Sequence, residues 1–173
     1  PYLDLDAPII GLEPSCLLTY VDEVPDLFPT DVRAQSLKGR AVLFETFVAQ
    51  EVAAGKLNHL SFQGKGVQVI YHGHCHQKAL VGTADTVAAL SHAGYAVEAL
   101  DTACCGMAGS FGYEREHAGI SRTMAERRLA PRIREADEST LIAAPGTSCR
   151  TQIVDTTGRV AHHPAELLLA ALV

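Results

Sequence analysis

The chain has 173 residues, of which 47% are hydrophobic, enough for the core of one full domain and an additional element. Its net charge of −6 at pH 7 disfavours nucleic acid or an anionic membrane surface as a partner, so we expect proteins or small molecules. No apolar run approaches the roughly 20 residues of a membrane span, and no signal segment is visible at the start. We therefore expect a cytoplasmic protein, attached at most peripherally to the inner face of the membrane through partners.

The first 63 residues predict a strand, an irregular stretch and a helix. The apolar run 7–12 is typical of a buried strand that leads into a loop containing Cys16. Pro25 and Pro29 bound the irregular stretch. A helix is then predicted from an N-cap at Asp31 to the vicinity of Gly55, with Gly39 as a potential break.

From residue 64 onward, strands alternate with helices. Strands are predicted at 67–71, 95–100 and 140–144, and helices at 83–93, 114–135 and 165–172. Pro131 is expected to shorten or distort the second of these helices. This alternation predicts a three-layer α/β fold with a mostly parallel sheet of about four strands, flanking helices and right-handed crossovers.

One segment echoes another within the chain. Residues 9–16 and residues 141–149 both contain an apolar strand, a proline-bearing turn, a hydroxyl residue and a cysteine. If the echo is real, residues 1–63 are the tail of a preceding repeat, packed on the main domain, and residues 64–173 form one complete domain. The alternative is that any two junctions between strand and loop look alike at this length. The chain also begins at Pro1 rather than at methionine, so we expect a piece of a larger protein.

The cysteines follow the predicted strands. Cys75, the pair Cys104 and Cys105, and Cys149 each come after a different strand, and the carboxyl ends of parallel strands lie at one edge of a sheet. We therefore expect four thiols to meet there, a soft donor set that suits iron–sulfur or zinc. Without a secretory signal, a disulfide framework is disfavoured. Cys16 follows the first strand in the same way and either joins the four or belongs to another half-site.

Glycines follow the paired cysteines at every third residue. Gly106 supplies the sharp turn that a pair of adjacent ligands needs, and Gly109 and Gly112 come after it. Such a turn exposes backbone N–H groups to an anion. A dinucleotide is disfavoured because the spacing departs from the Rossmann fingerprint, whereas the sulfurs of a cluster accept from the same groups.

Three histidines surround Cys75 at alternate positions. On an extended segment His72, His74 and His76 would share one face, opposite Cys75. They could hold a catalytic zinc ion and make the protein a hydrolase. Beside a thiolate cluster we favour a role as hydrogen-bond donors or proton carriers.

Four segments resemble the cysteine-rich CCG domain: residues 71–79, 104–114, 146–150 and 163–167. This domain occurs in one subunit of heterodisulfide reductase and in the iron–sulfur part of glycolate oxidase and related D-lactate dehydrogenases. The chain is most similar to the C-terminal end of large FAD-linked oxidases. The resemblance covers essentially the whole sequence and implies a Rossmann-like CCG fold.

The resemblance implies an iron–sulfur electron-transfer module of a flavin-linked oxidoreductase acting on a 2-hydroxy acid of the glycolate or D-lactate type. A separate FAD-binding domain would oxidise the substrate, a ferredoxin-like domain would lie on the same or a partner chain, and this chain alone would not be catalytically complete. The metal ligands implied are Cys16, Cys75, Cys104, Cys105 and Cys149. The residues implied around them are His74, His76, Gly106, Gly109, Gly146 and His163.

The chain departs from the family pattern at one position. Gly146 stands where the fullest pattern of the family has a further cysteine, and Glu13 stands at the equivalent place in the similar segment of residues 9–16. Four thiolates suit an ordinary 4Fe-4S cluster, whereas five resemble the set that holds a noncubane cluster. Four thiolates, or three with an imidazole, also suit structural zinc. A zinc-stapled docking domain without redox activity is therefore the alternative.

Overall fold

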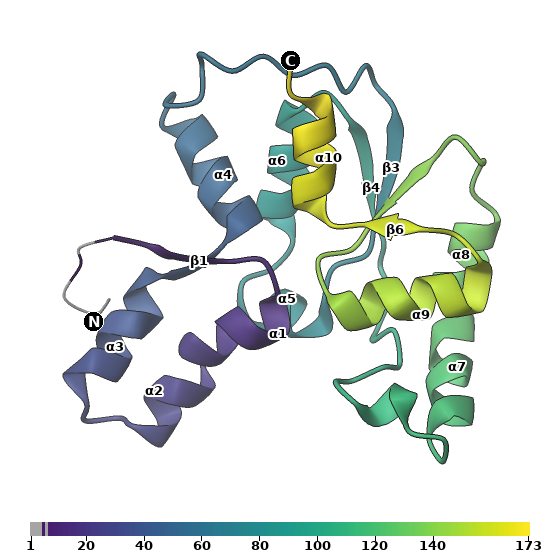
Figure 1. Cartoon of the computed structure of the whole chain (residues 1–173), viewed down its shortest axis with the longest axis horizontal. Coiled ribbons are helices and arrows are strands. Elements are labelled where there is room, and N and C mark those ends of the chain that lie inside the picture. The colour runs from purple at the N-terminus through teal and green to yellow at the C-terminus, as the bar shows by residue number, and fades with distance from the viewer. Residues whose placement is uncertain (1–4, 6) are drawn as a thin grey trace.

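The computed structural model describes residue 5 and residues 7–173, which form an α/β fold with two parallel sheets (Figure 1). The smaller sheet pairs β1 (Ile9–Gly11) with β2 (Ala41–Leu43). The larger has the order β4-β3-β5-β6. Its strands are β3 (Gln68–Tyr71), β4 (Ala96–Ala99), β5 (Leu141–Ala143) and β6 (Ala161–His162). The predicted four-stranded parallel sheet is confirmed.

Helices surround both sheets. In chain order they are α1 (Pro14–Leu17), η1 (Leu18–Tyr20), α2 (Glu23–Leu27), α3 (Val32–Arg40), α4 (Phe44–Ala53), α5 (Cys75–Leu80), α6 (Ala84–His92), η2 (Phe111–Tyr113), α7 (Ala118–Glu126), α8 (Leu129–Arg134), α9 (Thr147–Thr157) and α10 (Pro164–Ala171). None of the helices in the described part of the chain is long and apolar enough to cross a membrane.

The four-stranded sheet is buried on both faces because alternate side chains of a strand point in opposite directions. Val69 and Tyr71 of β3 pack on one face against α6 and α10, with α4 at the edge of this core. Ile70 points to the other face, where α8 and α9 cover it. Burial of each large aliphatic side chain contributes roughly 1.5–3 kcal/mol. These two cores give the three layers.

The chain changes faces at β3. It passes from β3 to β4 through α6 on one face and from β4 to β5 through α7 and α8 on the other. The neighbouring strands β3 and β5 are therefore followed by helices on opposite faces, α6 after β3 and α9 after β5. Where two neighbouring parallel strands lead to opposite faces, a crevice is left outside their carboxyl ends, and ligands bind there.

Two predicted helices are interrupted. The helix expected from Asp31 to Gly55 is wrong as one element: Asp31 does cap α3 by accepting from the backbone N–H of Arg33 at 2.8 Å, but residues 41–43 form β2. Pairing with β1 overrides the helical pattern there. The helix expected at 114–135 is divided into α7 and α8, with the break at residues 127–128 shortly before Pro131, consistent with the distortion expected from that proline. The sequence analysis also did not predict several short elements: α1, η1 and α2, where a loop and an irregular stretch were expected, and α5, α9 and β6.

Two polar contacts join the loop after β1 to the starts of α9 and α10, the helices that follow β5 and β6 of the larger sheet. The Glu13 carboxylate accepts from the backbone N–H and the hydroxyl of Thr147 at 2.8 and 2.9 Å, so it caps α9 from a distant segment. Nε2 of His163 bonds the Leu12 carbonyl at 2.9 Å. The order β1, α1, β2, α4 also parallels the order β5, α9, β6, α10. That residues 1–63 are the tail of a preceding repeat stays a prediction.

Glu45 lies buried between α4 and α10. Among the residues that the structure describes, neither carboxylate oxygen has a hydrogen-bond partner, and Oε1 lies 3.5 Å from Nε2 of His163. Burial raises the pKa of Glu45 to about 7. A carboxyl with a raised folded-state pKa is neutral in both states at low pH and costs stability once it must ionise.

We expect Glu45→Gln to become more stabilising, relative to the parent chain, as pH rises. Below about pH 4.5 the carboxyl is protonated whether folded or unfolded, and the penalty grows as pH rises through about 7, to at most about 3 kcal/mol. Urea unfolding at pH 5 and pH 8 measures the difference. Glu51→Gln, on the same helix but partly exposed, is the control. A Glu45→Gln effect that is identical at the two pH values would contradict this account.

Candidate metal centre

Four thiols lie in series at the carboxyl edge of the large sheet. Cys75 opens α5 after β3, Cys104 and Cys105 lie in the loop after β4, and Cys149 lies in the first turn of α9 after β5. Cys75 contacts Cys104, Cys104 contacts Cys105, and Cys105 contacts Cys149. All are free thiols. Their meeting follows from their places after parallel strands, whereas their role as metal ligands stays a prediction.

The thiols in the series alternate in acidity. Hydrogen bonds from the Cys105 and Cys75 thiols, and then from backbone N–H groups, lower the pKa of Cys104. A hydrogen bond from Cys105 and the neighbouring His72 lower the pKa of Cys149 despite its burial. The same contacts, together with burial, raise the pKa of Cys75 and Cys105. Two thiolates are thus held by two thiols, and a metal ion that binds all four must displace the remaining protons.

Gly106 makes the turn that brings the paired cysteines into this series. Its φ is +98°, and its N–H donates to Sγ of Cys104 over 3.3 Å. A Cβ at this position would lie 2.2 Å from the carbonyl oxygen of Ser121. Gly109, three residues on, also has a positive φ of +67°. The turn predicted from the sequence is therefore confirmed at Gly106, with one N–H directed at sulfur.

His72 is the imidazole that lies among the thiols. A ring nitrogen lies within 4.8 Å of the sulfurs of Cys105 and Cys149. Nδ1 bonds the hydroxyl of Thr102 at 2.7 Å, while Nε2 is buried and the ring lies beside the Cys149 thiol, whose pKa it lowers. The sequence pattern did not distinguish His72 from its neighbours. Its position directly after β3, where the sheet edge begins, was the signal that could have done so.

The three histidines around Cys75 do not share a face, and that expectation is wrong. Because α5 begins at Cys75, the segment turns there instead of staying extended. His74 caps α5 by accepting from the N–H of His76 at 3.2 Å, and His76 itself lies 3.8 Å from Glu23. No group of the three imidazoles with metal-ligand spacing forms in the described part of the chain. The geometry thus gives a three-histidine zinc site no support.

Gly146 borders the thiol series at the position of the missing cysteine. A Cβ there would lie 2.5 Å from Cδ2 of His74 and 3.3 Å from Sγ of Cys149. The ring of His74 therefore occupies the space that a side chain at 146 would enter. Of the residues expected around the ligands, Gly146 and His74 are brought together beside Cys149.

Cys16 and His163 lie outside the series. Cys16 is exposed on α1, which packs beside α5 (Figure 1), and it belongs to none of the groups with metal-ligand spacing in the described part of the chain. His163 uses both ring nitrogens elsewhere: Nδ1 accepts from the N–H of Ala165 at 3.0 Å, and Nε2 bonds the Leu12 carbonyl. His163 therefore stabilises the start of α10 rather than donating to a thiolate.

Three residues that the sequence pattern did not reveal hold the loops in place. Lys78 donates to the carbonyls of Thr102 and Ala103. Arg150 Nη1 donates to the Ala144 carbonyl in the loop after β5 at 3.0 Å, and Gln152 Nε2 donates to the Cys105 carbonyl in the loop after β4 at 2.9 Å. Each stands within a turn of a cysteine, which was the available signal.

The donor set fits a thiophilic metal centre. Four sulfurs in contact, two of them favoured as thiolates, are the ligands that iron–sulfur clusters and zinc share. His72 adds a buried imidazole nitrogen beside the sulfurs of Cys105 and Cys149. Metal coordination would satisfy such groups, which are otherwise costly to bury.

We expect Gly106→Ala to lower the free energy of unfolding by more than about 3 kcal/mol, because the methyl would meet backbone at a positive φ. Urea denaturation of the metal-free chain measures it. Gly119→Ala in α7 is the matched control, since a Cβ there meets nothing within 4 Å and the helix gains up to about 1 kcal/mol. Equal stability of the two variants would contradict the close approach.

Comparison with known proteins shows relatives of modest identity. The chain is 28% identical over 168 residues to a subunit of the anaerobic glycerol-3-phosphate dehydrogenase of Escherichia coli, covering 95% of this chain and 40% of that protein. It is 27% identical over 168 residues to the D-2-hydroxyglutarate dehydrogenase of Pseudomonas putida, covering 96% of this chain and 15% of the relative. The Escherichia coli D-2-hydroxyglutarate dehydrogenase is 28% identical, with coverages of 95% and 16%.

No family model matches the chain, and no solved structure shows significant similarity to it. The chain spans between 15% and 40% of the length of these curated relatives. What the similarity supports is therefore a module associated with oxidoreductases.

Proposed function

We propose that this chain is an iron–sulfur electron-transfer module of the CCG type within a larger, FAD-linked oxidoreductase that acts on a 2-hydroxy acid. Cys75, Cys104, Cys105 and Cys149 hold the centre. The observation that carries the proposal is their contact in series at the carboxyl edge of the sheet, with the pKa of Cys104 and Cys149 lowered. A bound 4Fe-4S cluster would supply one-electron transfer.

The protein groups around the thiols set how such a centre behaves. The Gly106 N–H already donates to Cys104 sulfur, and donors of this kind tune the reduction potential of a thiolate centre. Cys105 and Cys149 are buried, whereas Cys75 is exposed and Cys104 partly so. Electrons would therefore enter and leave on the side of Cys75 and Cys104.

The remaining parts of the enzyme lie in other domains or chains. The relatives are dehydrogenases of which this chain spans only a part, and one of their named substrates, D-2-hydroxyglutarate, is a 2-hydroxy acid. An FAD-binding domain and a ferredoxin-like domain complete the electron path in this proposal, with glycolate and D-lactate as further substrates of the same class. A cytoplasmic location belongs to the same proposal.

The ligand assignment predicts which variants lose the centre. After anaerobic reconstitution with iron and sulfide, we expect broad absorbance at roughly 400 nm, and we expect Cys104→Ser and Cys149→Ser to abolish it because each removes a thiolate from the middle or end of the series. Cys16→Ser, on exposed α1, is the control and should retain it. Optical spectra with iron and sulfide analysis make the measurement. Retention of the cluster by Cys104→Ser, or its loss from Cys16→Ser alone, would refute this ligand set.

A zinc-stapled docking domain is the second candidate, because His72, Cys105 and Cys149 already form a compact, buried group. We expect His72→Leu to leave the iron content unchanged if four thiolates hold a cluster. If the site holds zinc through His72, the same variant should lower zinc affinity by tenfold or more. Metal titration of the parent and variant separates the two. Stoichiometric, colourless zinc after failed iron reconstitution would overturn the redox proposal.

A further inference from the structure

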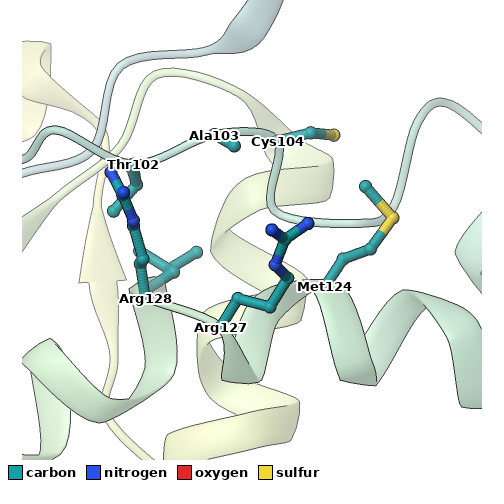
Figure 2. A pocket seen from close by; sticks show the side chains of 7 residues that line it. Thr102, Ala103, Cys104, Met124, Arg127 and Arg128 are labelled. Carbon is teal, nitrogen blue, oxygen red and sulfur yellow. The ribbon is translucent and has the colours of Figure 1, made fainter.

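A cavity opens beside Cys104. Its volume is about 460 Å³, within the range of small-molecule sites. One wall is the segment of residues 102–104 and the other is the junction between α7 and α8 (Figure 2). The lining residues are Thr102, Ala103, Cys104, Met124, Arg127, Arg128 and Leu129.

Two consecutive arginines, Arg127 and Arg128, face this cavity because they lie at the break between α7 and α8. In a continuous helix, neighbouring side chains point roughly 100° apart. Here α7 ends at Glu126, and Arg128 has φ −150° and ψ −44°, outside the helical range. Figure 2 shows the Arg127 and Arg128 side chains rising toward the segment that contains Thr102 and Cys104.

The positive charge in the cavity is only partly compensated. Arg132 and Arg134, farther along the same helix pair, are engaged by Glu98 and Glu126. Arg128 reaches Asp101 Oδ2 at 3.4 Å, on the exposed rim. The Arg127 guanidinium has neither a hydrogen bond nor an ion pair among the described residues.

The lining itself carries no carboxylate, and a third cation stands behind the wall. Lys78 donates to the carbonyls of Thr102 and Ala103, which form that wall. The protein as a whole carries a charge of −6, so this accumulation of cations is local. Met124, Leu129 and Ala103 add apolar surface to the lining.

We propose that this cavity binds a small organic anion, with a carboxylate or phosphate held by Arg127 and Arg128 and an apolar body lying between Met124 and Leu129. Guanidinium groups bind both oxyanions through charge-assisted hydrogen bonds. The cavity is separate from the buried part of the thiol series and needs no metal. Cys104 belongs to both, so the bound anion touches the exposed end of the proposed centre.

The test uses the full 173-residue chain, metal-free and reduced, so that its outcome does not depend on the identity of the metal. Phenyl phosphate, benzoate, inorganic phosphate and benzyl alcohol are titrated while backbone amide resonances are followed by NMR. We expect saturable shifts from phenyl phosphate or benzoate at residues 102–104 and 124–129. Inorganic phosphate and benzyl alcohol should bind at least tenfold more weakly, because inorganic phosphate lacks the apolar body and benzyl alcohol lacks the oxyanion. The stronger of the two aryl anions identifies the oxyanion.

Arg127→Gln should weaken the aryl anion at least tenfold, since a charge-assisted hydrogen bond is lost. Arg122→Gln, an exposed arginine of α7 outside the cavity, is the matched control and should leave affinity unchanged. Added salt should weaken binding to the parent chain. Scattered, unsaturable shifts, an unchanged affinity in Arg127→Gln, or equal losses in the two variants would overturn the proposal.

Discussion

Four thiols that contact one another in series impose the central constraint on this protein, because neighbouring sulfurs so close together cannot all ionise without a compensating cation. The chain meets the constraint by alternation: Cys104 and Cys149 are favoured as thiolates, and Cys75 and Cys105 as the thiols that donate to them. The backbone N–H of Gly106 adds a further donor. Such a cluster is a strong ligand set that releases protons when a metal binds.

The surrounding structure holds three loops against one another so that the contacts persist. Lys78 binds the loop after β4, Arg150 the loop after β5, and Gln152 reaches across to the Cys105 carbonyl. Glu13, from the loop after β1, caps α9 two residues before Cys149. The thiol edge is therefore fixed by side chains from all the elements around it. The loop after β4 also forms one wall of the cavity that Arg127 and Arg128 line.

The parallel sheet and the grouping of the cysteines could be predicted because both depend on local patterns. β-branched runs mark the strands, and a residue that follows a parallel strand lies at the carboxyl edge whatever else the fold does. The break at β2 could not be predicted in this way. Residues 41–43 follow a helical pattern, and only pairing with β1, some thirty residues away, makes them a strand. The short helix α5 was missed because Cys75 and its histidines suggested an extended segment.

The sequence by itself determined the fold class and which thiols would meet, since these follow from side-chain type and from order along the chain. Only the tertiary structure decided that His72 lies among the thiols, that Cys16 stays exposed on α1, and that His163 serves α10. It also decided that Arg127 and Arg128 face one cavity. The physical reason is that burial, a hydrogen-bond partner and the direction of a side chain depend on segments far apart in the sequence, which meet only when the cores pack.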